Sequence, residues 1–242
     1  MKTRLNLLTI AFLFIANSCF GQSEKFNLGF EVYTNLADRY GDNEVLKDIE
    51  SPRLAASFGA VVSYRANPKV ALISGLSMLN KGWKDNTALN FNELRWGSQS
   101  DDEGGFDPGI FSGEVINSVT VKHNYYFLSI PLNVRYGFGE SLDKGWYVQG
   151  GVSPVFYLFN RSRVIQETDT GTRDETYKEV IDDARKVNLN LNLGMGYTFL
   201  LKEKFQISVG PSLEYMPFSV VKDARWKNNF YAYGVGARFM VL

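Results

Sequence analysis

Apolar and polar residues alternate over unusually long segments of this chain. In Tyr126–Phe138 every even-numbered residue is apolar, and Ser129, Asn133 and Arg135 lie between them. In Val187–Phe199 every odd residue is apolar and every even residue is Asn, Gly or Thr. This period indicates strands with one oily and one polar face. Soluble strands have about 5–6 residues, whereas a membrane-crossing strand needs about 9–11, so the pattern favours a membrane-spanning sheet.

The alternation predicts eight strands whose connections are long and short in turn. The strands are Phe26–Thr34, Ala56–Arg65, Lys69–Trp83, Val121–Phe138, Gly145–Phe159, Lys186–Leu200, Phe205–Met216 and Asn229–Val241. Among the long connections are Lys84–Thr120 and Asn160–Arg185. This order is typical of outer-membrane barrels. We therefore expect an all-β fold, a closed eight-stranded antiparallel up-and-down transmembrane β-barrel with long extracellular loops and short periplasmic turns.

Some residues do not fit regular strands. Ile73 and Leu79 fall on the inward side of the third strand, and a bulge there would repair the parity. Three prolines lie inside expected strands, where each removes a ladder hydrogen bond: Pro131, Pro154 and Pro211. We expect bulges beside Gly150-Gly151 and Gly210 to accommodate two of these prolines.

The two faces of the strands predict lipid outside and polar side chains within. The outward set includes Phe30, Phe58, Trp146, Val209 and Val235. The inward set contains a lumen charge network of Glu31, Arg65, Arg135, Glu214 and Arg238. Because side chains fill an eight-stranded barrel, we expect these charges to pair across the lumen as a polar plug. A central apolar core containing Leu128, Leu191 and Ile207 would overturn this interpretation.

The N-terminus has the features of a secretory signal peptide. Lys2 and Arg4 precede the apolar stretch Leu5–Ala16, and small residues follow. We expect residues 1–21 to be removed and 22–242 to form the barrel domain. An alternative is a lipobox ending at Cys19, which would become a lipidated N-terminus. Cleavage would remove the only cysteine, and the mature charge of about −2 gives no nucleic-acid footprint.

Several motifs follow one another in the second half of the chain. They are Ile130-Pro131-Leu132, Trp146–Gly151 (WYVQGG), Leu193–Tyr197 (LGMGY) and Gly234–Phe239 (GVGARF). Their order resembles the outer-membrane β-barrel proteins of Bacteroidota, a porin-family barrel group that includes PorT-like proteins. The resemblance implies a fold, an outer-membrane location and, for PorT-like relatives, an association with protein secretion and assembly. The chain departs from the pattern at its end, because Met240-Val241-Leu242 follow the final aromatic residue.

Catalytic and metal-binding chemistry has little support in the sequence. A lipid A-modifying enzyme would use His123, the only histidine, which lies near Ser118 and Glu114 without forming a known motif. Calcium could bind a group of loop acids, but their spacing matches no EF-hand: Asp101, Asp102, Glu103 and Asp107. We therefore expect no enzyme activity, no catalytic or metal site and no cofactor.

The remaining hypotheses concern interaction and transport. The first is a structural or interaction protein of the cell envelope. Its loops, with Trp96, Phe106, Phe111 and Asp101, suit contact with an envelope protein partner or a surface glycan. The second is a narrow porin-like channel. The third, a secreted lipocalin-like binder, requires an apolar interior, the reverse of the parity found. We expect membrane lipid and lipopolysaccharide as surroundings, and a monomeric barrel.

Overall fold

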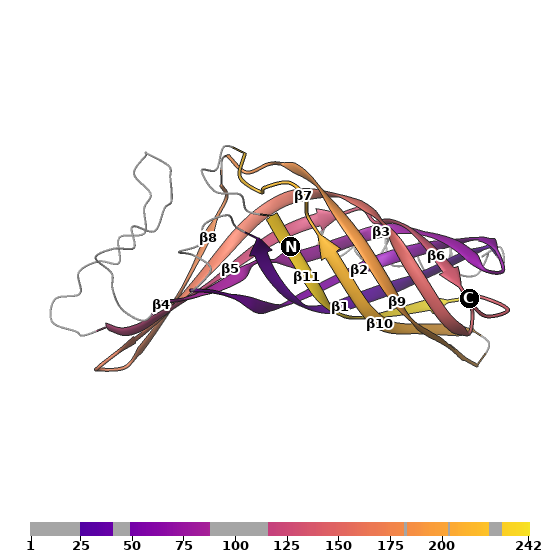
Figure 1. Cartoon of the computed structure of the whole chain (residues 1–242), viewed down its shortest axis with the longest axis horizontal. Coiled ribbons are helices and arrows are strands. Elements are labelled where there is room, and N and C mark those ends of the chain that lie inside the picture. Colours follow the sequence, from indigo (N-terminus) through magenta and orange to yellow (C-terminus); the bar gives the residue numbers. More distant parts are fainter. Residues whose placement is uncertain (1–24, 41–48, 88–115, 182, 203, 223–228) are drawn as a thin grey trace, which may run out of the picture.

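Eleven strands make up the part of the chain that the structure describes, residues 25–40, 49–87, 116–181, 183–202, 204–222 and 229–242. In this computed structural model they are β1 (Phe26–Tyr40), β2 (Glu50–Asn67), β3 (Val70–Lys81), β4 (Trp83–Thr87), β5 (Ile116–Ser129), β6 (Leu132–Gly137), β7 (Gly145–Thr168), β8 (Thr172–Glu179), β9 (Val187–Leu201), β10 (Phe205–Tyr215) and β11 (Asn229–Val241). They belong to one sheet that curves around a central space (Figure 1). Within these ranges no helix is long and apolar enough to cross a membrane.

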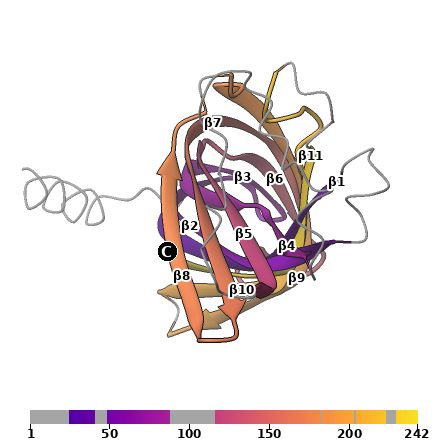
Figure 2. The same ribbon diagram turned by 90° about the vertical axis from the view of Figure 1, so that its left-hand side faces the viewer.

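All neighbouring strands are antiparallel, and the first strand pairs with the last. β1 pairs with β2 on one side and with β11 on the other. The pairings continue from β2 to β3, from β3 to β5 and β6, from these to β7, and through β9 and β10 back to β11. The result is the up-and-down, barrel-like all-β fold that the alternating pattern predicts (Figure 2).

The strand count differs from our prediction of eight for two reasons. Two predicted strands are divided. Gly82 separates β3 from β4. Ile130-Pro131 separates β5 from β6, because the proline cannot donate to the ladder. In addition, Asn160–Arg185, which we predicted to be a loop, contains the end of β7 and all of β8.

The prolines are accommodated without the bulges that we predicted. The register is continuous through Gly150-Gly151 and through Gly210. Pro154 lies opposite the interruption between β5 and β6, where the Ile130 N–H donates to the Pro154 carbonyl over 3.0 Å. The missing N–H groups of Pro131 and Pro154 therefore fall within one local defect of the ladder.

The third predicted strand also contains no bulge. β3 keeps one register with β5 and β6, and the shift in its pairing with β2 comes from an extra residue of β2 between Arg65 and Asn67. Ile73 and Leu79 are both buried on the inward side. Each belongs to a small apolar cluster, Ile73 with Val61 and Met240. The prediction that a bulge turns Ile73 and Leu79 outward is wrong. The interior of the sheet accepts apolar side chains toward both ends of the strands, in addition to polar ones.

Most apolar side chains in the middle of the strands nevertheless point outward. Phe30, Trp146 and Val235 are 55%, 63% and 55% exposed. Leu191 is exposed, Leu128 and Ile207 are half-buried, and none of the three belongs to a buried apolar cluster of the described residues. A central hydrophobic core of the kind that would have overturned the interpretation is therefore not formed by these side chains.

Aromatic rings pair on the outer surface near both ends of the strands. Near the short turns, Trp146 packs edge-on against Tyr197 with ring centroids 5.5 Å apart. Near the long connections, Tyr126 of β5 stacks on Phe159 of β7 at 4.6 Å. At ~3.3 Å per residue and a tilt of about 40°, the stretch from Tyr126 to Phe138 rises about 30 Å, which matches a bilayer's hydrocarbon core.

One end of the sheet extends well beyond the rest. β4, β5, β7 and β8 continue past the other strands, on the left of Figure 1. The register of β5 and β7 shifts at this point, because Tyr126 pairs with Phe159 whereas Phe127 pairs with Tyr157. The additional residue, Leu158, is a bulge that reverses the parity of β7, so that Arg161 and the odd residues beyond it face outward.

Candidate functional site

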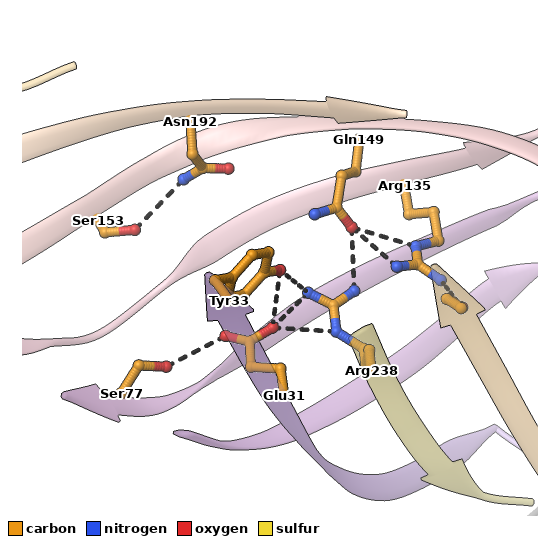
Figure 3. Close-up of polar contacts among 9 residues, drawn as sticks. Glu31, Tyr33, Ser77, Arg135, Gln149, Ser153, Asn192 and Arg238 are labelled. Carbon is orange, nitrogen blue, oxygen red and sulfur yellow. Dashed lines mark hydrogen bonds and ion pairs between the residues drawn. The ribbon is translucent and has the colours of Figure 1, made fainter. Parts of the chain in front are cut away.

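The centre of the lumen contains a buried ion pair between the first and last strands. Glu31 and Arg238 are direct partners in the register of β1 and β11. Nη2 of Arg238 donates to Oε2 of Glu31 over 2.6 Å, and Nε donates to the same oxygen over 3.1 Å (Figure 3). The hydroxyl groups of Tyr33 and Ser77 each donate to the Glu31 carboxylate over 3.1 Å. The carboxylate is therefore satisfied on both oxygens.

Gln149 links this pair to a second guanidinium group. Its Oε1 accepts hydrogen bonds from Arg238 Nη1 over 3.0 Å and from Arg135 Nη2 over 2.9 Å. Arg135 also donates to Ser208 over 2.8 Å, and its guanidinium lies 3.9 Å from the Tyr147 ring centroid. Neutral acceptors and an aromatic face thus stabilise the charge of Arg135, which forms no ion pair among the described residues.

Glu214 belongs to a separate pair, nearer the end of the lumen from which the sheet extends. Its Oε2 forms an ion pair with Nζ of Lys81, whose side chain is completely buried. The Asn190 amide donates to the same carboxylate oxygen over 3.3 Å. Because an ion in such a site has lost its hydration, each partner depends on the other.

Arg65 lies apart from the other four predicted charges. It is half-buried near the short turns, where Nη1 donates to Asp143 Oδ2 over 3.0 Å. The predicted set is therefore divided in three: Glu31, Arg135 and Arg238 share one network, Glu214 pairs with Lys81, and Arg65 pairs with Asp143.

A small polar cavity lies between the network of Glu31 and Arg238 and the pair of Lys81 and Glu214. Its volume is about 40 Å³, and its lining includes Glu31, Gln149 and Glu214. Three buried oxygen atoms on its walls accept or donate no hydrogen bond within the described residues: Asn133 Oδ1, Asn190 Oδ1 and Ser212 Oγ. A cavity of this size and polarity has room for ordered water but not for a continuous aqueous path.

Apolar side chains fill the lumen above this polar layer. The upper cluster consists of Leu79, Trp83, Tyr125, Phe127, Val155, Met216, Val220 and Phe230. Its aromatic rings are in contact, with Trp83 5.6 Å from Tyr125 and Tyr125 5.2 Å from Phe230. This apolar layer covers the polar centre on the side of the extension.

The turn after β6 covers the other end. Leu142 is 5% exposed, and its carbonyl accepts a hydrogen bond from the Gln206 amide over 2.6 Å. The Leu142 N–H donates to the Pro68 carbonyl of a neighbouring turn over 2.9 Å. The lumen is thus occupied along its length by an apolar layer, a polar layer and a covering turn.

His123 lies at the base of the extension, with neighbours that the sequence did not suggest. Its Nε2 lies 2.9 Å from Asp85 Oδ2, and the Ser162 hydroxyl lies 3.3 Å from its Nδ1. The ring also stacks on Trp83 with centroids 4.4 Å apart. A Ser-His-Asp series is the arrangement of many hydrolases, but the long serine contact and the stacked ring favour a packing role here.

The candidate calcium ligands and the loop residues expected to contact a partner lie outside the described residues. Asp101, Asp102, Glu103 and Asp107 are in this category, as are Trp96, Phe106 and Phe111. Among the residues that are described, no group of three His, Cys, Asp or Glu side chains is close enough to hold a metal ion.

Sequence reasoning missed several partners in the lumen. Lys81 has the same parity as Ile73 and Leu79, so the poor fit of that strand concealed it. Gln149 is an inward residue of β7 that carries no charge, and Asp143 lies in a turn where parity has no meaning. Attention to uncharged inward amides would have found Gln149.

The chain is similar to known proteins of the outer membrane. A family described as outer membrane protein beta-barrel domain matches residues 20–217. Among solved structures, Neisserial surface protein A is 12% identical, with 90% of this chain and 97% of that chain covered and a TM-score of 0.42. Ail of Yersinia pestis, crystallised with the heparin analogue sucrose octasulfate, is 11% identical, with 88% and 99% covered and a TM-score of 0.37. Neither similarity bears on function at this level. No curated protein matches the sequence.

Proposed function

The chain belongs to the outer membrane protein β-barrel domain family, which makes it a protein of the bacterial outer membrane, and from this premise we propose that its strands form a closed, eight-stranded wall across the bilayer. In this wall β3 and β4 together form one barrel strand, β5 and β6 together form another, and β8 lies outside the wall. The pairing of β1 with β11 supports closure, since it leaves neither strand with an open edge.

We further propose the usual orientation, with the short turns in the periplasm and the extension outside the cell. Residues 1–21 would be a signal peptide that directs export and is then removed, with lipidation at Cys19 as the alternative. The difference in length between the two ends supports this orientation, because outer-membrane barrels have short periplasmic turns.

For the function itself, we propose a structural or interaction role in the cell envelope, linked to protein secretion or assembly. The observation that carries this proposal is the filled lumen, in which ion pairs and apolar layers surround a cavity of about 40 Å³. A protein without an open path acts through its surface, so an envelope protein partner would bind the extracellular side.

Planar-bilayer recording tests the sealed lumen. The purified chain should give no discrete conductance steps, because the apolar layer around Phe127 would have to open and fill with water before ions pass. Reproducible steps that respond to Lys81→Met would support the narrow-channel alternative and overturn the proposal. The folded state of each sample can be checked by its heat-modifiable gel mobility.

Photo-crosslinking in whole cells tests the interaction role. Val180 follows β8 and is 65% exposed, so a crosslinker placed there should give one discrete adduct with an envelope protein. A matched crosslinker at Trp146, which is 63% exposed on the lipid-facing surface, should not give that adduct. Identical adducts at both positions would contradict a specific partner.

We propose that the protein is not an enzyme, and the His123 group provides the test. The natural protein, as well as His123→Ala and Ser162→Ala, should leave acyl release from lipid A at the background of membranes that lack the protein. Activity in the natural protein that both variants abolish would establish a hydrolase and contradict this part of the proposal.

A further inference from the structure

The outward face of the extension carries positive charges in register across neighbouring strands. Lys84 of β4 is the direct partner of Lys122 of β5, and Lys122 is the direct partner of Arg163 of β7. One step nearer the barrel, Arg161 of β7 is the direct partner of Lys178 of β8. Direct partners project on the same side of a sheet, so these five side chains form one surface, which we call the basic face.

Such an arrangement is unfavourable when the charges have no counter-ions. Neighbouring strands are about 4.8 Å apart, and like charges placed directly opposite each other destabilise a sheet. Two acids share the surface: Asp174 accepts a hydrogen bond from Arg163 Nε over 2.8 Å, and Glu167 accepts one from the Ser118 hydroxyl over 2.9 Å. Cations are therefore in excess on the basic face, which favours an external anion.

The position of the basic face identifies the kind of anion. The stacked rings of Tyr126 and Phe159 form the last aromatic row of this side, and Nζ of Lys178 lies 4.4 Å from the Phe159 centroid. Successive rows are about 7 Å apart, so the Arg161–Lys178 row lies at the depth of lipid headgroups. The basic face is thus continuous with the lipid-facing surface.

The opposite side of the barrel has no such charges. The outward positions of β1, β9, β10 and β11 include neither lysine nor arginine. Near the outer end these strands present Tyr40, Tyr215, Tyr231 and Val187. Among the outward positions of the described strands, the cations are therefore confined to β4, β5, β7 and β8, whereas the exposed Lys186 and Lys222 lie in connections on the other side.

We propose that the basic face binds the phosphate groups of an anionic glycolipid of the outer leaflet, of the lipopolysaccharide class. Lys122, Arg161 and Lys178 contact the phosphates, and the neighbouring aromatic row contacts the acyl chains. Asp174 competes with the phosphates for Arg163, to which it is hydrogen-bonded. The inference rests on the proposed orientation, because only then does this face meet the outer leaflet.

The test measures binding of diphosphoryl lipid A to the full chain in neutral-lipid nanodiscs by native mass spectrometry. Neutralising three charges together, with Lys122→Gln, Arg161→Gln and Lys178→Gln, should weaken binding on the order of 100-fold, at about fivefold per charge near an anionic headgroup. Removing the competing acid with Asp174→Asn should strengthen it about fivefold. A merely structural role for these charges does not produce that opposite sign.

The control variant combines Lys69→Gln and Lys204→Gln, which neutralise exposed charges at the short turns and should leave binding unchanged. Equal weakening by the control, or equal binding of dephosphorylated lipid A, would overturn the inference. Displacement by inorganic phosphate at the same concentration would also overturn it, since the face would then be a site for free anions. Protease access in whole cells tests orientation separately, so failure of the orientation and failure of the binding site are distinguishable.

Discussion

The lumen and the basic face use the same charged residue types in opposite ways. In the lumen, Glu31 and Arg238 are about 5% and 3% exposed, and each is satisfied by named partners. On the basic face, Lys122 has lysine and arginine as its direct neighbours. The first arrangement is satisfied within the molecule, whereas the second is complementary to something outside it.

The difference indicates where each set of charges has its effect. A buried ion pair contributes little net stability, yet the loss of one partner leaves an uncompensated charge and is very costly. An exposed cation remains hydrated, so its loss hardly affects folding. Substitutions in the lumen should therefore change stability, and substitutions on the basic face should change binding.

The largest expected effect is that of Glu31→Gln. It leaves the Arg238 guanidinium buried without its carboxylate, and we expect a loss of about 3–5 kcal/mol in the free energy of unfolding. Urea unfolding in lipid vesicles, followed by tryptophan fluorescence, measures it. The matched control is Glu167→Gln on the extension, which should change the free energy by less than about 0.5 kcal/mol. Similar losses for both would remove the distinction between the two regions.

The second prediction concerns Lys81 and Glu214. Lys81→Met alone should cost about 3 kcal/mol, because Glu214 remains buried with only an amide donor. Adding Glu214→Gln should restore most of that loss, to within about 1 kcal/mol of the natural protein. The same unfolding experiment checks the coupling, and simple additivity of the two losses would show that the pair does not act as a unit.

A smaller effect is expected for Arg65, which sharpens the comparison because its surroundings are intermediate. Its side chain and that of Asp143 are 25% and 22% exposed. Arg65→Gln should therefore cost only about 1 kcal/mol, since water can replace the lost contact. A loss as large as that of Glu31→Gln would mean that exposure does not determine these costs.

The smallest stability change is expected for Lys122→Gln. Removing one member of the row Lys84, Lys122, Arg163 relieves repulsion, so the free energy of unfolding should stay equal or rise by up to about 0.5 kcal/mol. A clear destabilisation in the absence of glycolipid would indicate an internal partner for Lys122 and weaken the case for an external one.

Acidification should loosen the hairpin of β7 and β8. The hydrogen bond from Arg163 to Asp174 lowers the pKa of Asp174 below its usual 3.8. The contact is therefore fully present above that value and is lost as pH falls through the lowered pKa. Limited proteolysis at the exposed turn 169–171 should become faster in that acidic range, whereas in Asp174→Asn it should not depend on pH there.

The sequence predicted those parts of the fold where one face meets an apolar medium. β11 was predicted at its observed bounds, and β9 and β10 within one residue at each end, because their outward residues are apolar throughout. β8 and the end of β7 were missed, since both faces of the extension are polar or mixed and the period of two disappears. The divided strands depend on Gly82 and Pro131, whose effect on pairing is not visible in hydrophobicity.

Parity alone could not predict the pairing within the lumen. It placed Glu31, Arg135, Glu214 and Arg238 on the inward side, but which charges meet depends on the height of each residue along a tilted strand. Arg65 was separated from the others by that height. The basic face was missed for a related reason, because it depends on a bulge that no sequence signal marked.

The Leu158 bulge decides which way a whole hairpin faces. It adds one residue to β7, and every side chain from Phe159 onward changes sides as a result. If Leu158 instead paired with Tyr126 in an unbroken ladder, Arg161 and Arg163 would point toward the axis and Val164 toward the surroundings, with no charged residue altered. Affinity for a membrane surface can thus be gained or lost through the pairing register of a strand, by a route that comparison of charged positions would overlook.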